Sequence, residues 1–105
     1  MGLDFAIDAL YETGWTAEDS TGCRSHRDGR KYPTEDLVRQ NFEENGYKIS
    51  IRHVQLFDCY RAEWWVARSP ATSQLSGSVV GQTAEEAAVY AMSQLRRQLV
   101  AGAKA

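Results

Sequence analysis

The fold is decided by residues 47–67, whose sequence is YKISIRHVQLFDCYRAEWWVA. Apolar and polar residues alternate in its first half, and the alternation resumes after Asp58 and Cys59. A period of two is typical of a strand with one buried face, and two such runs around a short turn predict an antiparallel hairpin. With Asp58 and Cys59 as the turn, the predicted pairs are Ile51 with Val66, His53 with Trp64, and Arg52 with Trp65.

The two faces of this hairpin differ in chemistry. One face carries the apolar partners together with His53, which this register predicts to be a buried histidine. The other face is polar and carries Lys48, Ser50, Arg52, Arg61 and Glu63. Trp65 lies on the polar face, so Arg52, Arg61 and Trp65 are predicted to form an aromatic, cationic surface. Such residues often anchor protein interfaces; Arg–Trp packing within the chain and stacking on a nucleic-acid base are the alternatives.

Downstream of the hairpin, residues 77–81 (GSVVG) predict a third strand. Thr83 and Glu86 then match the capping box T-x-x-E, which predicts the start of a helix. An apolar stripe continues that helix to about Leu99, and residues 100–105 are expected to fray.

Upstream of the hairpin, the sequence predicts two further helices. Residues 3–13 have apolar side chains at helical spacing and are followed by Gly14. Thr34 predicts the N-cap of a second helix, which is expected to end at Asn45 and Gly46.

The resulting order, α-α-β-β-β-α, predicts an α+β fold in which a three-stranded antiparallel sheet packs against helices. A three-layer α/β/α sandwich is the alternative. The chain has 105 residues, which is room for a single domain over residues 1–105. Its 43% hydrophobic and 25% charged residues exclude disordered, collagen-like and disulfide-dense classes. The sequence has no apolar run that could span a membrane and no basic start typical of a secretory signal, so we expect a cytoplasmic protein with no membrane partner.

Charge is unevenly distributed along the chain, although the net charge is only −2. Residues 1–20 contain five acids and no base, and Asp4, Asp8 and Glu12 repeat at helical spacing. This acidic row is either a solvated face or a surface for a basic partner. Residues 15–31 have no apolar period and predict a long loop, and loops of that length are either functional or disordered. The loop contains the basic residues Arg24, Arg27, Arg30 and Lys31, a run that is either a solvated loop or a binding surface.

The cysteines and histidines fall into two pairs, and they suggest one candidate metal site. Cys23 and His26 lie in the predicted loop, whereas His53 and Cys59 lie at the hairpin. Four such ligands are what a tetrahedral zinc site needs, so a zinc-stabilised domain is one alternative, although the spacing matches no standard finger. We otherwise expect reduced thiols, no cofactor and no enzymatic activity, since the motifs of phosphate-binding loops, serine hydrolases and zinc proteases are absent from the sequence.

Most of the chain resembles the phage α/β/α-sandwich proteins of unknown function. The resemblance rests on residues 14–15 (Gly-Trp), residues 32–34 (Tyr-Pro-Thr), and the Thr- and Ala-rich helix over residues 83–95. Aromatic residues in the strands, Tyr47, Tyr60 and Trp64, add to it. This resemblance implies a small phage or prophage accessory protein and supplies no catalytic residues.

The second half of the chain is also similar to HicB antitoxins, in which a strand with an aromatic residue is followed by G-x-T-x-E-E-A, here residues 81–87. The α-β-β-β-α order further resembles the double-stranded-RNA-binding domain. That family binds phosphates with basic residues at the start of its last helix, where residues 83–88 of this chain are acidic, so RNA binding by that mode is not expected.

The function predicted from the sequence is a non-enzymatic protein-interaction module that binds or inhibits a host protein. Two surfaces are its candidates, and both are cationic: Arg24, Arg27, Arg30 and Lys31 in the loop, and Arg52, Arg61 and Trp65 on the sheet. Nucleic-acid binding through residues 24–31 is the alternative, because phosphate contacts require such clusters of cations.

Overall fold

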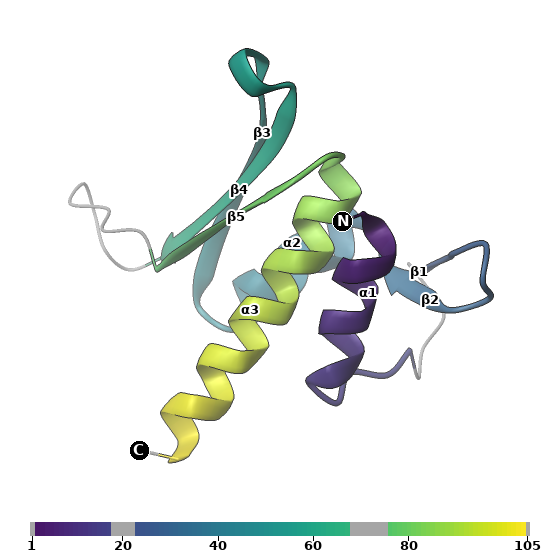
Figure 1. Cartoon of the computed structure of the whole chain (residues 1–105). Helices are drawn as coiled ribbons and strands as arrows, with labels where there is room; N and C mark the ends of the chain where they lie inside the picture. Colours follow the sequence, from purple (N-terminus) through teal and green to yellow (C-terminus); the bar gives the residue numbers. More distant parts are fainter. Residues whose placement is uncertain (1, 18–22, 68–75, 105) are drawn as a thin grey trace.

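The computed structural model describes residues 2–17, 23–67 and 76–104. The predicted α+β class is confirmed: a three-stranded antiparallel sheet packs against helices, and a small two-stranded sheet lies apart from it (Figure 1). In chain order the elements are α1 (Leu3–Glu12), β1 (Cys23–Ser25), β2 (Lys31–Pro33), α2 (Glu35–Glu44), β3 (Tyr47–Val54), the 3-10 turn η1 (Gln55–Phe57), β4 (Cys59–Val66), β5 (Gly77–Gly81) and α3 (Ala84–Lys104). No helix in the described ranges is long and apolar enough to cross a membrane.

Local sequence signals account for the starts of α2 and α3 and for the end of α2. The hydroxyl oxygen of Thr34 accepts a hydrogen bond from the backbone N–H of Leu37 at 3.3 Å, and that of Thr83 accepts one from Glu86 at 3.1 Å. Gly46 follows α2 with a φ of 83°, a conformation that glycine adopts without strain. The predicted end of the last helix near Leu99 is wrong, because α3 continues to Lys104 through an alanine-containing segment without proline.

The predicted hairpin of β3 and β4 is confirmed, but its register is wrong. Arg52 lies opposite Arg61, Ile51 opposite Ala62, and His53 opposite Tyr60. Asp58 and Cys59 are not a two-residue turn, since residues 55–57 form η1 and Asp58 has a left-handed backbone with a φ of 48°. The longer turn displaces the pairing by four residues. Because this displacement is even, every side chain stays on the face that the sequence predicts.

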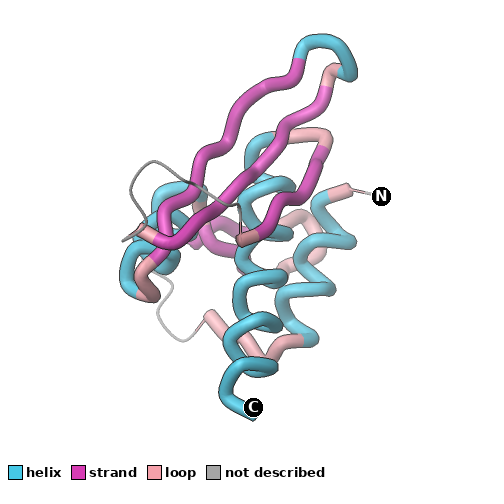
Figure 2. The backbone as a smooth tube through the Cα atoms, turned by 90° about the vertical axis from the view of Figure 1, so that its left-hand side faces the viewer, coloured by secondary structure: helices cyan, strands magenta, loops and turns pink. Residues whose placement is uncertain are grey.

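The core lies between the sheet and the helices. Helices α2 and α3 cover one face of the β3–β4–β5 sheet, and α1 packs against α3 (Figures 1 and 2). Trp64 is the largest fully buried side chain, and its ring packs on Phe42 with centroids 5.6 Å apart. In the described part of the chain no helix covers the opposite face of the sheet, so the structure has two layers there and not the three of the alternative sandwich.

The long loop predicted over residues 15–31 is only partly correct. Residues Cys23–Ser25 and Lys31–Pro33 pair as the antiparallel hairpin β1–β2. The backbone N–H of His26 donates to the carbonyl of Arg30 at 2.7 Å, and Gly29, with a φ of 91°, makes the turn. Strands of three residues are too short to give an apolar period, so the sequence pattern does not reveal them. Residues 18–22 of the predicted loop lie outside the described residues.

Candidate functional site

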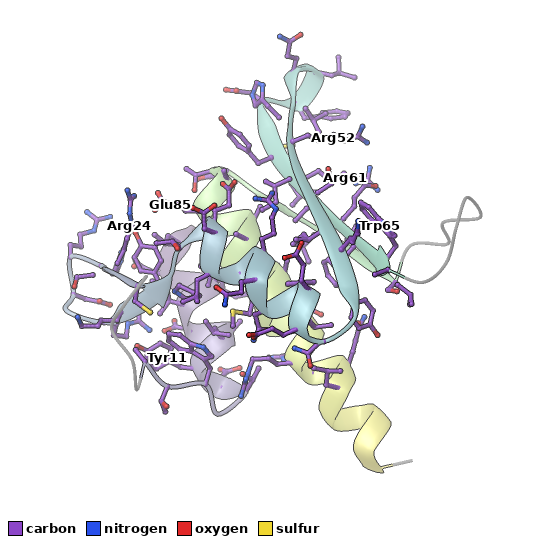
Figure 3. The ribbon with its side chains drawn as sticks, turned by 180° about the vertical axis from the view of Figure 1, so that it is seen from behind. Tyr11, Arg24, Arg52, Arg61, Trp65 and Glu85 are labelled. Carbon is purple, nitrogen blue, oxygen red and sulfur yellow. The ribbon has the colours of Figure 1, made fainter. Side chains whose placement is uncertain are left out.

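The helices leave the polar face of the three-stranded sheet uncovered in the described structure (Figures 1 and 3). Its side chains come from alternate positions of the three strands, and we call them the sheet face: Lys48, Ser50, Arg52, Arg61, Glu63, Trp65, Ser78 and Val80. Arg52, Arg61 and Trp65 project from the sheet on the side away from α2 and α3 (Figure 3). The structure therefore brings the three predicted sheet residues onto one face, although Trp65 lies opposite Lys48 and not opposite Arg52.

One carboxylate organises the cations of the sheet face. Glu63 is only 16% exposed at its side chain, and its two oxygens lie 3.3 Å from Nη2 of Arg52 and 3.5 Å from Nε of Arg61. The Nε atom of Arg61 is buried and makes no hydrogen bond to another described group. Arg52 and Arg61 are directly opposite each other, so Glu63 screens a repulsion between like charges. With Lys48, the four charged residues give this face a net charge of +2 on a chain whose net charge is −2.

Replacing Glu63 by glutamine is expected to destabilise the protein by about 1 kcal/mol, because two opposed guanidinium groups lose the carboxylate between them. The loss should be larger at low than at high ionic strength, since salt screens the remaining repulsion. Urea unfolding at two salt concentrations measures this, with Glu43→Gln on the exposed side of α2 as the matched control. A salt-independent loss equal to that of the control would contradict this role.

The sheet face continues into a projecting hairpin tip, which we define as residues 55–58. Strands β3 and β4 pair as far as Val54 and Cys59, beyond the end of β5 opposite Tyr60 (Figure 1). At the tip Leu56 is 83% exposed and Phe57 is 74% exposed.

Side-chain contacts support the base of the tip. The carboxylate of Asp58 lies 3.1 Å from Nε2 of His53, and the His53 ring packs on Tyr60 with centroids 4.9 Å apart. His53 is exposed and not buried as predicted, because the tip extends beyond the helices. Sequence reasoning missed Leu56 and Phe57; the available signal was two large apolar residues adjacent to each other where the strand alternation stops.

The basic residues of the predicted loop lie on the β1–β2 hairpin, and two of them are paired with acids of the chain itself. Nη1 of Arg24 donates to Glu85 at 2.8 Å, and Arg30 binds both Asp8 and Asp28. These hydrogen bonds, with Glu85 and Asp8 respectively, raise the pKa of both guanidinium groups. Arg27 is exposed, and the Lys31 carbonyl accepts a hydrogen bond from Tyr11.

The acidic row of α1 also finds its partners within the chain. Asp4 contacts His26, Asp8 contacts Arg30, and Glu12 lies 3.2 Å from Arg97 of α3. Next to this network Tyr32 is buried, and its desolvation together with Glu85 raises the pKa of its phenol. Asp8 of the acidic row thus neutralises Arg30 of the hairpin, and Glu85 of α3 neutralises Arg24, which weakens the case for a nucleic-acid surface at residues 24–31.

The predicted zinc set is not brought together. Cys23 and His26 lie on the β1–β2 hairpin, whereas His53 and Cys59 lie near the tip of β3–β4, in a separate part of the molecule (Figure 1). The prediction failed because the residues between these pairs form α2 and most of β3, which separate them in space. Among the described residues, the group whose ligand atoms do converge is Asp4, His26 and Asp28.

Comparison of the chain with protein-family models, curated proteins and solved structures found no match. The resemblances to phage sandwich proteins and to HicB antitoxins therefore stay predictions.

Two surface hollows are further candidate sites. One, of about 360 Å³, lies where α2 and α3 begin and is lined by Arg24, Thr34, Glu35, Asp36 and Glu85. Another, of about 190 Å³, lies between α1 and α3, with Phe5 and Tyr90 in its lining. In the first hollow, the hydroxyl oxygen of Thr34 is the N-cap acceptor of α2.

Proposed function

We propose that this protein is a non-enzymatic interaction module that binds an acidic region of a partner protein through the sheet face and the hairpin tip. The observation that carries the proposal is the uncovered cationic sheet face around Arg52, Arg61 and Trp65. Val54 and Cys59 occupy positions of the same face, so the surface runs without interruption from Trp65 to the tip.

The chemistry of this surface favours a protein partner. Tryptophan, arginine and phenylalanine are enriched at interfaces, where a few such anchors supply most of the binding energy. The positive face on a negative chain favours an approaching acidic surface and rejects a basic one. A nucleic acid fits less well, because the carboxylate of Glu63 stands among the cations that would contact phosphates.

The partner class follows from the sequence resemblances. They support a phage or prophage accessory role, in which the module binds or inhibits a host protein in the cytoplasm. Inhibition requires only that the bound module cover a functional surface of the partner, and the proposal therefore needs no catalytic residues in this chain.

Two surface variants test the proposal. Arg52→Glu with Trp65→Ala alters the sheet face, and Phe57→Ser alters the tip at a side chain with few contacts to lose. Each is expected to weaken binding of the captured partner by about 30-fold or more, the effect of losing an interface anchor worth about 2 kcal/mol. The measurement is affinity capture from host lysate with quantitative mass spectrometry, followed by titration of the purified partner.

Matched controls carry the same chemistry elsewhere on the surface. Arg27→Glu reverses an exposed charge on the β1–β2 hairpin, and Leu99→Ser removes an exposed apolar side chain of α3. Both should bind like the unaltered protein. Equal capture of the partner by all variants would refute the proposed surface. If the captured ligand is instead removed by nuclease and its binding weakens steeply with salt, the protein is a nucleic-acid binder.

A further inference from the structure

Three potential metal ligands converge where the β1–β2 hairpin meets α1. Asp4 lies in the first turn of α1, His26 directly follows β1, and Asp28 lies in the turn of the hairpin. A ring nitrogen of the histidine and a carboxylate oxygen from each aspartate lie within 4.8 Å of one another. Zinc holds tetrahedral ligands roughly 3.4 Å apart, given bonds of about 2.0–2.2 Å. Binding would therefore draw the most distant of these atoms together by up to roughly 1.4 Å and would separate Nε2 of His26 from the Asp4 carboxylate, to which it is now hydrogen-bonded.

The imidazole of His26 is held in place by the hairpin. Its side chain is only 10% exposed, and its edge faces the ring of Tyr32 with centroids 6.4 Å apart. The backbone N–H of His26 donates to Arg30, and its carbonyl accepts from Gly29 at 2.9 Å. Nε2 is hydrogen-bonded to the Asp4 carboxylate, which fixes the direction of the ring. A bound metal would replace the proton that Nε2 shares with Asp4, and that proton would pass to solvent.

The Asp28 carboxylate is also oriented for a cation. It accepts hydrogen bonds from the backbone N–H of Arg30 at 3.0 Å and from its Nε at 2.7 Å. The backbone hydrogen bond is the main cause of the lowered pKa of Asp28. An ionised carboxylate has about four lone-pair sites, so both oxygens can still accept a further ligand. Hydrogen bonds from groups that do not themselves bind the metal commonly orient metal-binding carboxylates.

The charge around the three ligands favours a divalent cation. The Arg30 guanidinium is shared between Asp28 and Asp8, so three carboxylates and one guanidinium give a local charge of −2 with His26 neutral. An imidazole combined with carboxylates suits zinc and neighbouring transition metals, whereas calcium and magnesium prefer all-oxygen sites.

We propose that Asp4, His26 and Asp28 form a binding site for a divalent transition metal of the zinc class. Three protein ligands leave a fourth position for water. The metal would join the first turn of α1 to the β1–β2 hairpin, two segments that are distant in sequence, and would thereby stabilise the N-terminal part of the fold. This site is independent of the sheet face and of the proposed partner.

Calorimetric titration of the chelator-treated protein with zinc chloride tests the proposal. We expect one zinc per chain and a rise in the melting temperature on binding. Asp4→Asn should weaken zinc binding by more than the roughly 10–100-fold that is expected for loss of an outer-sphere partner. Because the Asp4 side chain is exposed, this substitution should leave the protein folded. His26→Asn should do the same, with circular dichroism as the check that each variant is folded.

His53→Asn is the matched control, because His53 also pairs with an aspartate, Asp58, but among the described residues no second carboxylate converges on it. It should bind zinc like the unaltered protein. Cobalt in place of zinc identifies the ligand type, since thiolate ligands add a near-ultraviolet charge-transfer band that nitrogen and oxygen ligands lack. The proposal is overturned by an absence of zinc binding, by unchanged binding in Asp4→Asn, or by a thiolate band that places the metal on Cys23 or Cys59.

Discussion

Replacing Trp64 by alanine is expected to lower the free energy of unfolding by about 3–5 kcal/mol, the range for removing a large aromatic side chain from a core. Trp64 is 1% exposed and lies between the sheet and the helices, where it packs on Phe42. Its Nε1 donates to Gln98 of α3 at 3.4 Å, so the residue connects the central strand to the longest helix. Equilibrium unfolding in urea measures the loss.

The adjacent tryptophan supplies a matched control. Trp65 has the same side chain one position later, but it points to the opposite face and is only half-buried. Trp65→Ala should therefore cost much less stability than Trp64→Ala. Equal losses from the two substitutions would show that the faces of β4 are assigned incorrectly, and the proposed binding surface would then be wrong as well.

Replacing Gly77 by alanine is expected to destabilise the protein by about 1–3 kcal/mol, which is typical of overpacking a core. A Cβ atom at this position would lie 2.2 Å from Cζ2 of Trp64, far closer than two carbon atoms can approach. The Trp64 ring is fully buried and packs on Phe42, so it can turn aside only by displacing its neighbours in the core. Glycine to alanine in a strand is otherwise neutral or favourable, so a loss reports the clash.

A double-mutant cycle separates this clash from any other effect at Gly77. In the Trp64→Ala background the added methyl group meets no ring, and Gly77→Ala should then cost little or even recover some stability. The two substitutions are in direct contact, so a coupling energy of this size is expected. Additive losses would mean that the close approach of Gly77 to the indole does not exist in solution.

Local signals made much of the fold predictable. The caps Thr34 and Thr83 act through hydrogen bonds within a few residues, and the alternation in β3 and β4 reports one buried face directly. The register of β3–β4 was not predictable in the same way, because it depends on the geometry of η1. The β1–β2 hairpin has strands of three residues, which carry too few side chains to show a period.

The candidate sites likewise differ in whether a local sequence pattern or only the tertiary fold reveals them. Strand alternation alone placed Arg52, Arg61 and Trp65 on one face, and this prediction survived the wrong register because the displacement was even. The exposure of Leu56 and Phe57 depends on how far the hairpin extends past β5, which no local pattern states. The contact of Asp4 with His26 joins segments that only the tertiary fold brings together, so the sequence suggested a different ligand set.

The even displacement between the two β3–β4 registers has a consequence for how this sheet is specified. Both pairings keep each side chain on the same face of the sheet, so the alternation of apolar and polar residues does not discriminate between them. The register is instead set by the turn, because η1 and the left-handed backbone of Asp58 determine which residues of β3 and β4 pair. The backbone of the hairpin tip thus aligns the strands, while its exposed side chains Leu56 and Phe57 are the ones that we propose for recognition.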